Sequence, residues 1–437
     1  MPIEKAKIKK SIATGLYGAL TLIKWLGIGI MMGLIVGAIS SAFSFCLSFV
    51  TDLRMKHPYI VYGLPLGGLA IVGLYKLILK DKAKGTNVVI NSILDKPQIS
   101  SLIAPLIFFS TVVTHLFGGS AGREGAALQL GGSIANTFGR VFRFKDRDRK
   151  IIIMSGMSAA FSALFGTPMA AAIFAIEAAT VGSLYIASLL PCVVAAVVAG
   201  YFSASLGISP ESFEISYIPK FGIATGSKTI LLAILVGIVS IGFCAAMKYS
   251  KKYMAKWIKN PFLRVVVAAL VFLLITFLVG GEEYYGAGIE VIEHAVLHGE
   301  ATPYAFALKI LLTAIILGAG FQGGEIVPAF YVGATFGCVF GQIAGLSPGL
   351  CAAMGMTAMF CGITNCPITS MLISFELFGF ECVPYIIITA AVSFVASGYS
   401  GIYSSQQFMY SKYRPVFKKD VKGIKIERNK TKEKRES

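Results

Sequence analysis

An arginine and a glutamate stand side by side between glycines in the stretch Gly122-Arg123-Glu124-Gly125, and an apolar run follows them. Charged side chains at bilayer depth are costly and are usually retained for function. The flanking glycines favour a broken helix with exposed amides, which a membrane tolerates only around a cavity or a buried site. The residue types therefore predict an anion site at the start of a helix, where the Glu124 carboxylate competes with the anion.

Glu124 in this position is also expected to couple the anion to a proton. A carboxylate that an anion displaces and that loses its solvent should take up a proton, because burial disfavours the charged form. Proton passage would then accompany anion passage. The alternative is that Glu124 only favours the amino end of a helix, where acidic side chains are stabilised.

Three further stretches place glycines at expected helix starts: Gly85–Asn87, Gly323–Pro328 and Gly401–Ser404. Helix amino ends carry partial positive charge and unpaired N–H groups, so several converging ends can bind an anion. No metal or cofactor is expected. Glu325 is interpreted either as a site residue or as a helix-start acid, and Tyr403 either as a phenol facing the anion or as an interfacial tyrosine. The candidate anion-binding residues are Thr86, Asn87, Gly122, Arg123, Gly125, Glu325, Ile326, Val327 and Tyr403.

Composition predicts the elements that must position these residues. Of 437 residues, 56% are hydrophobic and 14% are charged, whereas a soluble domain has about 25% charged residues. We therefore expect an all-α polytopic membrane protein. Stretches long enough to cross a bilayer are Lys24–Val50, Tyr59–Lys80, Ile99–Phe117, Leu184–Ser205, Ile230–Met247, Leu263–Val279 and Ala305–Gly318. Shorter pieces predict broken, tilted half-helices that meet inside the membrane, namely Thr86–Leu94, Gly125–Phe138 and Pro328–Phe340.

Positive charge is unevenly distributed along the chain. The formal charge is +17, with Lys and Arg gathered near both termini and in loops around residues 76–84, 140–150 and 248–264. Gly280–Glu300 instead contains five glutamates and no lysine or arginine. This is the positive-inside pattern of a multi-pass protein, here expected in the plasma membrane with both termini cytoplasmic. The partner is thus expected to be the lipid bilayer and not a nucleic acid.

An internal repeat relates the two halves of the chain. Three blocks recur in the same order: Gly85–Val88 with Gly286–Ile289, Gly122–Gly139 with Gly324–Gly341, and Gly156–Glu177 with Gly355–Glu376. Equivalent loops differ in charge, so the halves are expected to be inverted, with a site near the midplane. Glu177 and Glu376 end matching helices and are expected to be structural or solvated. The expected organisation is an amphipathic segment (1–23), a first repeat (24–206), a linker (207–219), a second repeat (220–410) and a basic cytoplasmic tail (411–437).

The order of these motifs resembles that of the CLC chloride channels and transporters. The stretch from Gly122 to Gly125 is similar to their GREGP signature, and Gly324–Pro328 is similar to their GxFxP motif. Gly85–Val89 occupies the place of their GSGIP motif, and Tyr403 matches their inner-gate tyrosine. The resemblance implies an inverted-repeat fold and a homodimer with one pore per subunit. It also implies that Glu124 is the gating, proton-carrying glutamate.

Departures from the family pattern bear on which anion is carried. Ala126 replaces the proline of GREGP, and Thr86-Asn87 stands where the family has Ser-Gly. Ala178 occupies the position of the proton-relay glutamate of the chloride antiporters, with Glu177 as its neighbour. These departures resemble the bacterial branch that exports fluoride against protons, although Thr86 is close to the serine of the chloride proteins. We expect fluoride/proton antiport, with a chloride channel or chloride/proton antiporter as the alternative.

A different class, an intramembrane serine protease, is a remote alternative. Gly118–Gly122 fits the pattern GxSxG, which can present a nucleophilic serine. Such chemistry needs a base oriented toward Ser120. His115 lies five residues away on the same segment, and the other histidines fall near loops. No enzymatic activity is therefore expected.

Overall fold

The computed structural model describes residues 2–79, 85–95, 97–414 and 416, so most of the predicted tail lies outside the described residues. The first half contains α1 (Pro2–Lys56), α2 (Leu64–Leu79), α3 (Thr86–Leu94), α4 (Ile103–Leu116), α5 (Glu124–Val141), α6 (Asp146–Phe165), α7 (Pro168–Glu177) and α8 (Leu189–Ser205). The second half contains α9 (Ile223–Trp257), α10 (Pro261–Val279), α11 (Ile289–Leu297), α12 (Ala305–Ala319), α13 (Ile326–Ala344), α14 (Pro348–Thr364), α15 (Pro367–Phe378) and α16 (Val383–Ala396). The all-α prediction is confirmed, with one small addition, a parallel pair of two-residue strands, β1 (Thr180–Val181) and β2 (Gln407–Phe408).

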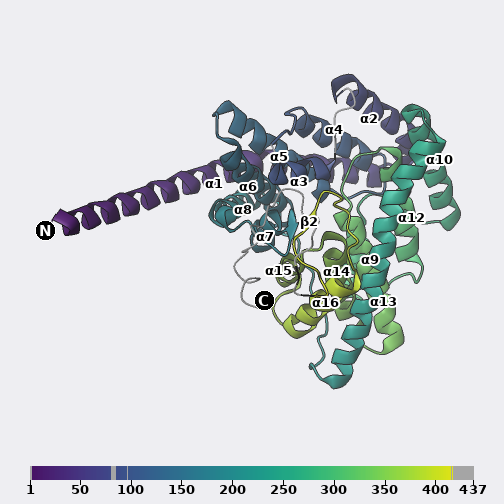
Figure 1. Cartoon of the computed structure of the whole chain (residues 1–437). Helices are drawn as coiled ribbons and strands as arrows, with labels where there is room; N and C mark the ends of the chain where they lie inside the picture. Colours follow the sequence, from purple (N-terminus) through teal and green to yellow (C-terminus); the bar gives the residue numbers. More distant parts are fainter. Residues whose placement is uncertain (1, 80–84, 96, 415, 417–437) are drawn as a thin grey trace, which may run out of the picture.

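Within the described part, six helical segments are long and apolar enough to cross a membrane. They are Gly15–Lys56, Pro58–Leu79, Ile186–Ser205, Ile223–Trp257, Pro261–Val279 and Ile326–Ala344. α3 and α11, with nine residues each, are too short to cross alone. Figure 1 shows the first half (purple to blue) beside the second (green to yellow), with the amino end of α1 projecting away from both.

The same close helix crossing occurs in both halves. A Cβ placed on Gly131 of α5 would lie 2.2 Å from the carbonyl oxygen of Gly156 in α6. A Cβ placed on Gly333 of α13 would lie 2.3 Å from the carbonyl oxygen of Gly355 in α14. Small residues allow helix backbones to approach this closely in a membrane protein. These glycines are the pairs that the sequence repeat aligns, so the packing bears out the repeat.

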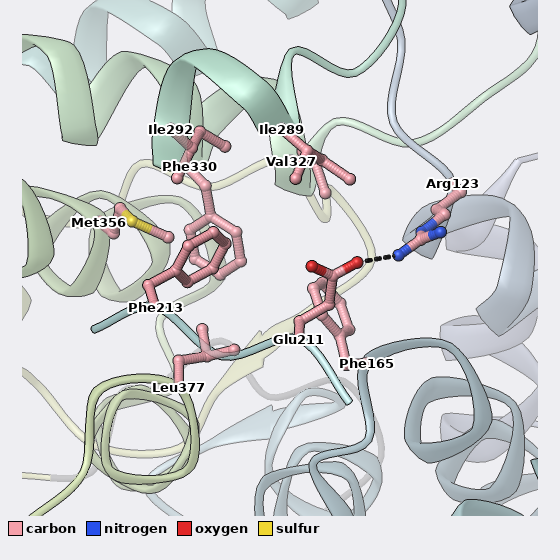
Figure 2. Close-up of a pocket in the computed structure, with 10 residues that line it drawn as sticks. All are labelled: Arg123, Phe165, Glu211, Phe213, Ile289, Ile292, Val327, Phe330, Met356 and Leu377. Atoms are coloured by element: carbon pink, nitrogen blue, oxygen red, sulfur yellow. Dashed lines mark hydrogen bonds and ion pairs between the residues drawn. The ribbon is translucent and has the colours of Figure 1, made fainter. Parts of the chain in front are cut away.

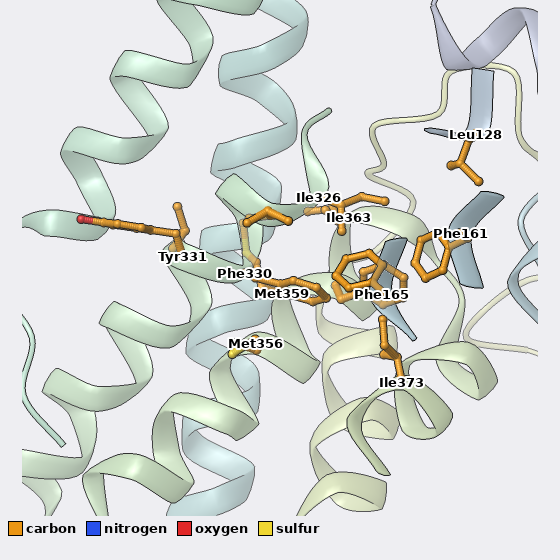
Figure 3. Close-up of a cluster of buried hydrophobic side chains, with 14 of the residues drawn as sticks. Leu128, Phe161, Phe165, Ile326, Phe330, Tyr331, Met356, Met359, Ile363 and Ile373 are labelled. Carbon is orange, nitrogen blue, oxygen red and sulfur yellow. The ribbon is translucent and has the colours of Figure 1, made fainter. Parts of the chain in front are cut away.

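Buried apolar side chains of both halves form a shared core beneath the starts of the half-helices (Figure 3). The ring centroids of Phe165 in α6 and Phe330 in α13 lie 6.2 Å apart, and those of Phe330 and Phe360 in α14 lie 5.5 Å apart. Figure 3 shows Met359 and Ile363 of α14 beside these rings. Close packing of this kind holds α13 at a fixed position against the first half.

The ends of the two repeats differ from expectation. α1 is one unbroken helix from Pro2 to Lys56, so no helix break separates residues 1–23 from the first span. The helix expected to begin near Gly401 is wrong, because residues 398–406 form turns and bends. The backbone there is bound by tertiary partners instead of its own helical turn, since Ile402 N–H donates to Ile363 O (2.9 Å).

Candidate functional site

Gly122 and Gly324, which the repeat aligns, are in direct contact. Gly122 N–H donates to Gly324 O (2.8 Å), and Gly324 N–H donates to Gly122 O (2.7 Å), which makes an isolated antiparallel bridge. The bridge brings the start of α5 beside the start of α13. Because a helix amino end is electropositive, two such ends meet at one place.

Only glycine fits at this contact, because a Cβ would come too close to neighbouring atoms. A Cβ placed on Gly324 would lie 2.6 Å from Gly125 N and 3.1 Å from Glu124 N. A Cβ placed on Gly122 would lie 3.0 Å from Pro328 Cδ. Any side chain at Gly324 would therefore cover the first amides of α5. We call Gly122, Gly125 and Gly324 the glycine junction.

Glu124 is the first residue of α5 and is fully buried. Its Oε2 accepts a hydrogen bond from Arg123 N–H (3.0 Å), so the carboxylate folds back over the start of its own helix. Its Oε1 lies 3.4 Å from Arg123 Nε without hydrogen-bond geometry, and it has no hydrogen-bond partner among the described residues. The carboxylate therefore occupies the position that an anion would take, and one of its buried oxygens is poorly satisfied.

A third helix start reaches the glycine junction from α3. Gly85 has a φ of 93°, a left-handed conformation that suits glycine, and Thr86 follows as the first residue of α3. Thr86 Oγ1 donates to Gly125 O (3.3 Å) and lies 3.5 Å from the point that a Cβ on Gly125 would occupy. The starts of α3, α5 and α13 thus converge around Gly125.

The stretch before and at the start of α13 places a second carboxylate at the same point. Glu325 Oε2 lies 3.3 Å from the position of a Cβ on Gly125. Ile326 and Val327 are buried, and their side chains join the shared core. These two residues can therefore offer an anion only backbone N–H groups, whereas Glu325 brings its carboxylate to the junction.

Tyr403 lies in the segment that follows α16. Its side chain is buried, its ring centroid lies 6.3 Å from that of Phe174, and its hydroxyl has no hydrogen-bond partner among the described residues. A buried hydroxyl without a partner is costly, so this phenol is free to donate to an anion. Asn87 holds the same segment, because its Oδ1 accepts from Ser405 N–H (3.0 Å). Only the amide nitrogen of Asn87 is then left for an anion.

Two residues that sequence reasoning missed also fix the Tyr403 segment. Gln406 Nε2 donates to Ala178 O (2.9 Å) and Thr364 O (2.8 Å), at the ends of α7 and α14. Asn365, with a φ of 58°, donates from Nδ2 to Gln406 Oε1 (3.1 Å). These amides satisfy carbonyls that helix ends leave unpaired. Their local sequence carries no pattern that would have revealed this role.

Arg123 is bound by an acid from the linker between the repeats. Its Nη2 forms an ion pair with Glu211 Oε1, which Figure 2 shows at one side of a narrow pocket. The pocket has a volume of about 10 Å³, and its walls are mostly apolar, including Phe213 and Val327. Such a volume holds about one water molecule. Sequence reasoning missed Glu211 because the two residues are 88 positions apart.

The serine of the GxSxG pattern is not paired with a histidine in the described hydrogen bonds. Ser120 Oγ bonds to Thr313 Oγ1 (2.9 Å), and His115 Nδ1 bonds to Thr111 O (2.9 Å). A serine nucleophile needs an oriented base, so the geometry does not support a protease. No group of three metal-ligating side chains occurs among the described residues.

Comparison with known proteins gives one consistent picture. Residues 67–398 match the model of the family described as voltage gated chloride channel. A chloride/fluoride channel protein of Pseudomonas syringae pv. tomato is 34% identical over 401 residues, which cover 90% of this chain and 88% of that protein. An H(+)/Cl(-) exchange transporter ClcA of Vibrio vulnificus is 25% identical, with 82% of each chain covered.

Solved structures show the same similarity. A CLC-type fluoride/proton antiporter superimposes with a TM-score of 0.85 at 30% identity, covering 89% of this chain and 98% of that chain. A slow cyanobacterial Cl-/H+ antiporter gives a TM-score of 0.70 at 19% identity, covering 86% and 94%. The second likeness supports the fold alone.

Proposed function

This chain belongs to the voltage-gated chloride channel (CLC) family, and we propose that it works there as a fluoride/proton antiporter. It is an anion transporter and not an enzyme. The observation that carries the finer proposal is the buried Glu124 carboxylate, which lies over the start of α5 beside the glycine junction.

The anion and the Glu124 carboxylate compete for the start of α5, and this competition couples anion movement to proton movement. An anion at the glycine junction would be bound by first-turn amides of α5 and α13, and by the Thr86 hydroxyl once its proton turns from Gly125 O to the anion. It cannot occupy the start of α5 while the Glu124 carboxylate is there. Once displaced, the carboxylate loses the N–H of Arg123 and takes up a proton, because a buried charge without partners is costly. Return of the carboxylate releases that proton and expels the anion, so the two move in opposite directions.

Fluoride is favoured over chloride by three observations. Fluoride is a small, strong hydrogen-bond acceptor, and the site offers two hydroxyls, from Thr86 and Tyr403, in addition to helix amides. Ala178 supplies no carboxylate where chloride antiporters carry their relay glutamate. The relative at 34% identity is named a chloride/fluoride channel, and the structure at 30% identity is a fluoride/proton antiporter.

Chloride transport is the second candidate. Thr86 is chemically close to the serine of the chloride proteins, and the Vibrio vulnificus relative exchanges chloride for protons. A chloride channel or chloride/proton antiporter would use the same helix ends and the same Glu124 gate.

The setting of the transporter follows from charge and family. We place it in the plasma membrane of a bacterium with both termini cytoplasmic, because Lys and Arg gather near the termini and in the loops around 76–84, 140–150 and 248–264, whereas 280–300 has glutamates and no Lys or Arg. We expect it to work as a homodimer with one pore per subunit.

Selectivity tests the choice of anion. The full chain is reconstituted into liposomes loaded with equal fluoride and chloride, and both efflux rates are recorded with ion-selective electrodes. We expect fluoride efflux well above chloride efflux. Equal rates would overturn the fluoride proposal while leaving the chloride alternative standing.

A further inference from the structure

A vestibule of about 810 Å³ opens beside the acidic 280–300 segment. It is lined by the end of α1, by the 3-10 helix Pro58–Gly63 and by the start of α11. Arg123 also lines it, whereas Glu124 and Thr86 do not. We call this space the outer vestibule, and it is distinct from the glycine junction.

Arg54 lines the outer vestibule beside Gly286, and Lys309, which is not among the lining residues, approaches the same glycine from within the protein. Arg54 Nη1 donates to His115 O (2.7 Å) and would lie 3.1 Å from a Cβ placed on Gly286. Lys309 is fully buried and donates from Nζ to Tyr284 O (3.2 Å) and Gly286 O (2.9 Å). No carboxylate of the described residues forms a salt bridge with either cation. Arg54 is partly buried and Lys309 is fully buried, and Glu290 and Glu283 act on them only without direct contact. A buried positive charge without a bonded counter-ion is costly, so this place favours an anion.

The start of α11 adds a helix amino end at the same place. α11 has nine residues, and Gly288 precedes it with a φ of 81° and no side-chain cap. Lys309 Nζ lies 3.3 Å from the position of a Cβ on Gly288. In the sequence repeat α11 is the counterpart of α3, whose start lies at the glycine junction. The second half thus has an equivalent helix start that the Glu124 site does not use.

A buried ring nitrogen of His115 without a hydrogen-bond partner also favours a ligand at this place. His115 is 4% exposed and lines the outer vestibule, and its Nε2 has no hydrogen-bond partner among the described residues. Its Nδ1 bonds to Thr111 O (2.9 Å). A carbonyl oxygen can only accept, so Nδ1 carries a proton, and Nε2 becomes a donor only when the ring is protonated.

We propose that the base of the outer vestibule is a second anion site, which takes a small monovalent anion such as fluoride between Arg54, Lys309, His115 and the start of α11. The acids that line the vestibule do not fill this place. Asp52, Glu282 and Glu290 are exposed at its rim, and Glu283 is half-buried.

Binding at this second site takes up a proton. The charged groups that face His115 are Arg54 from α1, Arg123 from the start of α5 and Lys309 from α12, and all three are cations. An anion bound against Nε2 would accept a hydrogen bond from the protonated ring and offset part of the repulsion from these cations. Anion binding at the second site is therefore linked to a proton on His115, separately from the proton on Glu124.

Calorimetric titration of the purified full-length protein with sodium fluoride tests the proposal. We expect two binding events, and Glu124→Gln serves as the background because its glycine-junction event can no longer take up a proton. The one remaining proton-linked event, shown by heats that depend on the ionisation enthalpy of the buffer, is then that of the outer vestibule. Arg54→Gln should weaken that event about tenfold or more, since it removes a charge-assisted contact, and His115→Gln should abolish its proton uptake. Two events that both survive Arg54→Gln unchanged, or a single event in wild type, would overturn the second site.

If Arg54→Gln does not fold, two substitutions of exposed glutamates test the site instead. Glu290→Gln removes a rim acid near Arg54 and should tighten the proton-linked event. Glu293→Gln removes an exposed acid of the same helix that does not line the vestibule, and should leave it unchanged. Equal effects of the two variants would contradict the site.

The choice of fluoride rests on the proposed function, so chloride is titrated in parallel. A proton-linked chloride event lost in Arg54→Gln would retain the site even if fluoride transport fails.

Discussion

Glu177 and Glu376 cap each other's helices across the two repeats. Glu177, at the end of α7, accepts from Ile368 N–H (3.2 Å) and Thr369 N–H (2.9 Å) at the start of α15. Glu376, in the last turn of α15, accepts in the same way from the second and third residues of α7, at 2.9 Å each. Each helix begins with a proline, which has no N–H, so one carboxylate binds the next two free amides.

This reciprocal capping gives Glu177 a structural role. Both of its oxygens are bound by the start of α15, and Oε2 also accepts from the Thr369 hydroxyl (2.5 Å). Its neighbour Ala178 has no acid to offer. Of the two outcomes that the sequence left open, the structural one is observed for both glutamates.

Removing either cap should destabilise the fold. Glu177→Ala and Glu376→Ala each leave two helix-start amides unpaired and should lower stability by about 1–2 kcal/mol. Thermal unfolding in detergent measures the loss. Glu381→Ala, at an exposed glutamate near α15, is the control and should have little effect. Wild-type melting of both cap variants would refute the capping role.

Filling the glycine junction should block transport. In Gly324→Ala the new methyl would lie against the first amides of α5, at 2.6 Å from Gly125 N. The start of α5 must also shift, because a real Cβ does not lie this close to a backbone nitrogen, so thermal unfolding in detergent is recorded beside transport. We expect fluoride efflux from liposomes to fall by about tenfold or more, because a helix-end anion site is lost. Gly242→Ala is the matched control, since nothing lies within 4 Å of its added carbon. A Gly324→Ala protein with the wild-type rate would show that these amides do not bind the anion.

The Tyr403 hydroxyl should serve the anion and not the fold. Because it has no protein partner among the described residues, Tyr403→Phe should keep the wild-type melting temperature yet weaken fluoride binding. Asn87→Ala should instead lower stability, because Ser405 N–H loses its acceptor. Calorimetry and thermal unfolding of both variants separate the two roles. Unaltered fluoride affinity in Tyr403→Phe would remove the phenol from the site.

Lys412, which follows the membrane helices, should give the fold a distinct dependence on pH. Its Nζ donates to Asn365 Oδ1 (2.6 Å) and Phe394 O (2.8 Å), and burial lowers the pKa of Lys412 to about 8. In the unfolded chain the pKa is about 10.4. Between these values the unfolded chain binds more protons, so stability rises with pH through this window. The melting temperature of wild type, measured against Lys412→Met, should therefore rise from pH 7.5 to 9.5, and a constant difference would contradict the burial of this ammonium.

Periodicity and repeats predicted where the broken helices lie, because these depend on local pattern, but not every length. Ile326–Ala344 is long enough to cross a membrane, whereas the stretches expected to cross at 99–117 and 305–318 form only α4 and α12, of 14 and 15 residues. Thr86–Leu94 coincides with α3, and the apolar pieces that begin at Gly125 and Pro328 lie inside α5 and α13. The aligned glycines anticipated the helix crossings, since close approach leaves no room for a side chain.

Contacts between distant segments could not be predicted in this way. The ion pair of Arg123 with Glu211 and the amide contacts of Gln406 join residues with no shared local pattern. The helix expected near Gly401 fails for the same reason, because the backbone there bonds to the end of α14. Hydropathy also predicted that the first repeat begins at residue 24. In the structure Lys24 lies within an unbroken α1 and donates to Asp148, a contact with a distant residue that hydropathy does not show.

The most direct test of the account is to record fluoride and protons together, in liposomes that contain wild type, Glu124→Gln or Glu177→Gln. With an outward fluoride gradient, wild type should release fluoride and take up protons. Glu124→Gln should lose the proton movement, because an amide in this position cannot carry a proton, and Glu177→Gln should keep it. Proton uptake that persists unchanged in Glu124→Gln would contradict the central claim that the buried carboxylate over α5 couples the two ions.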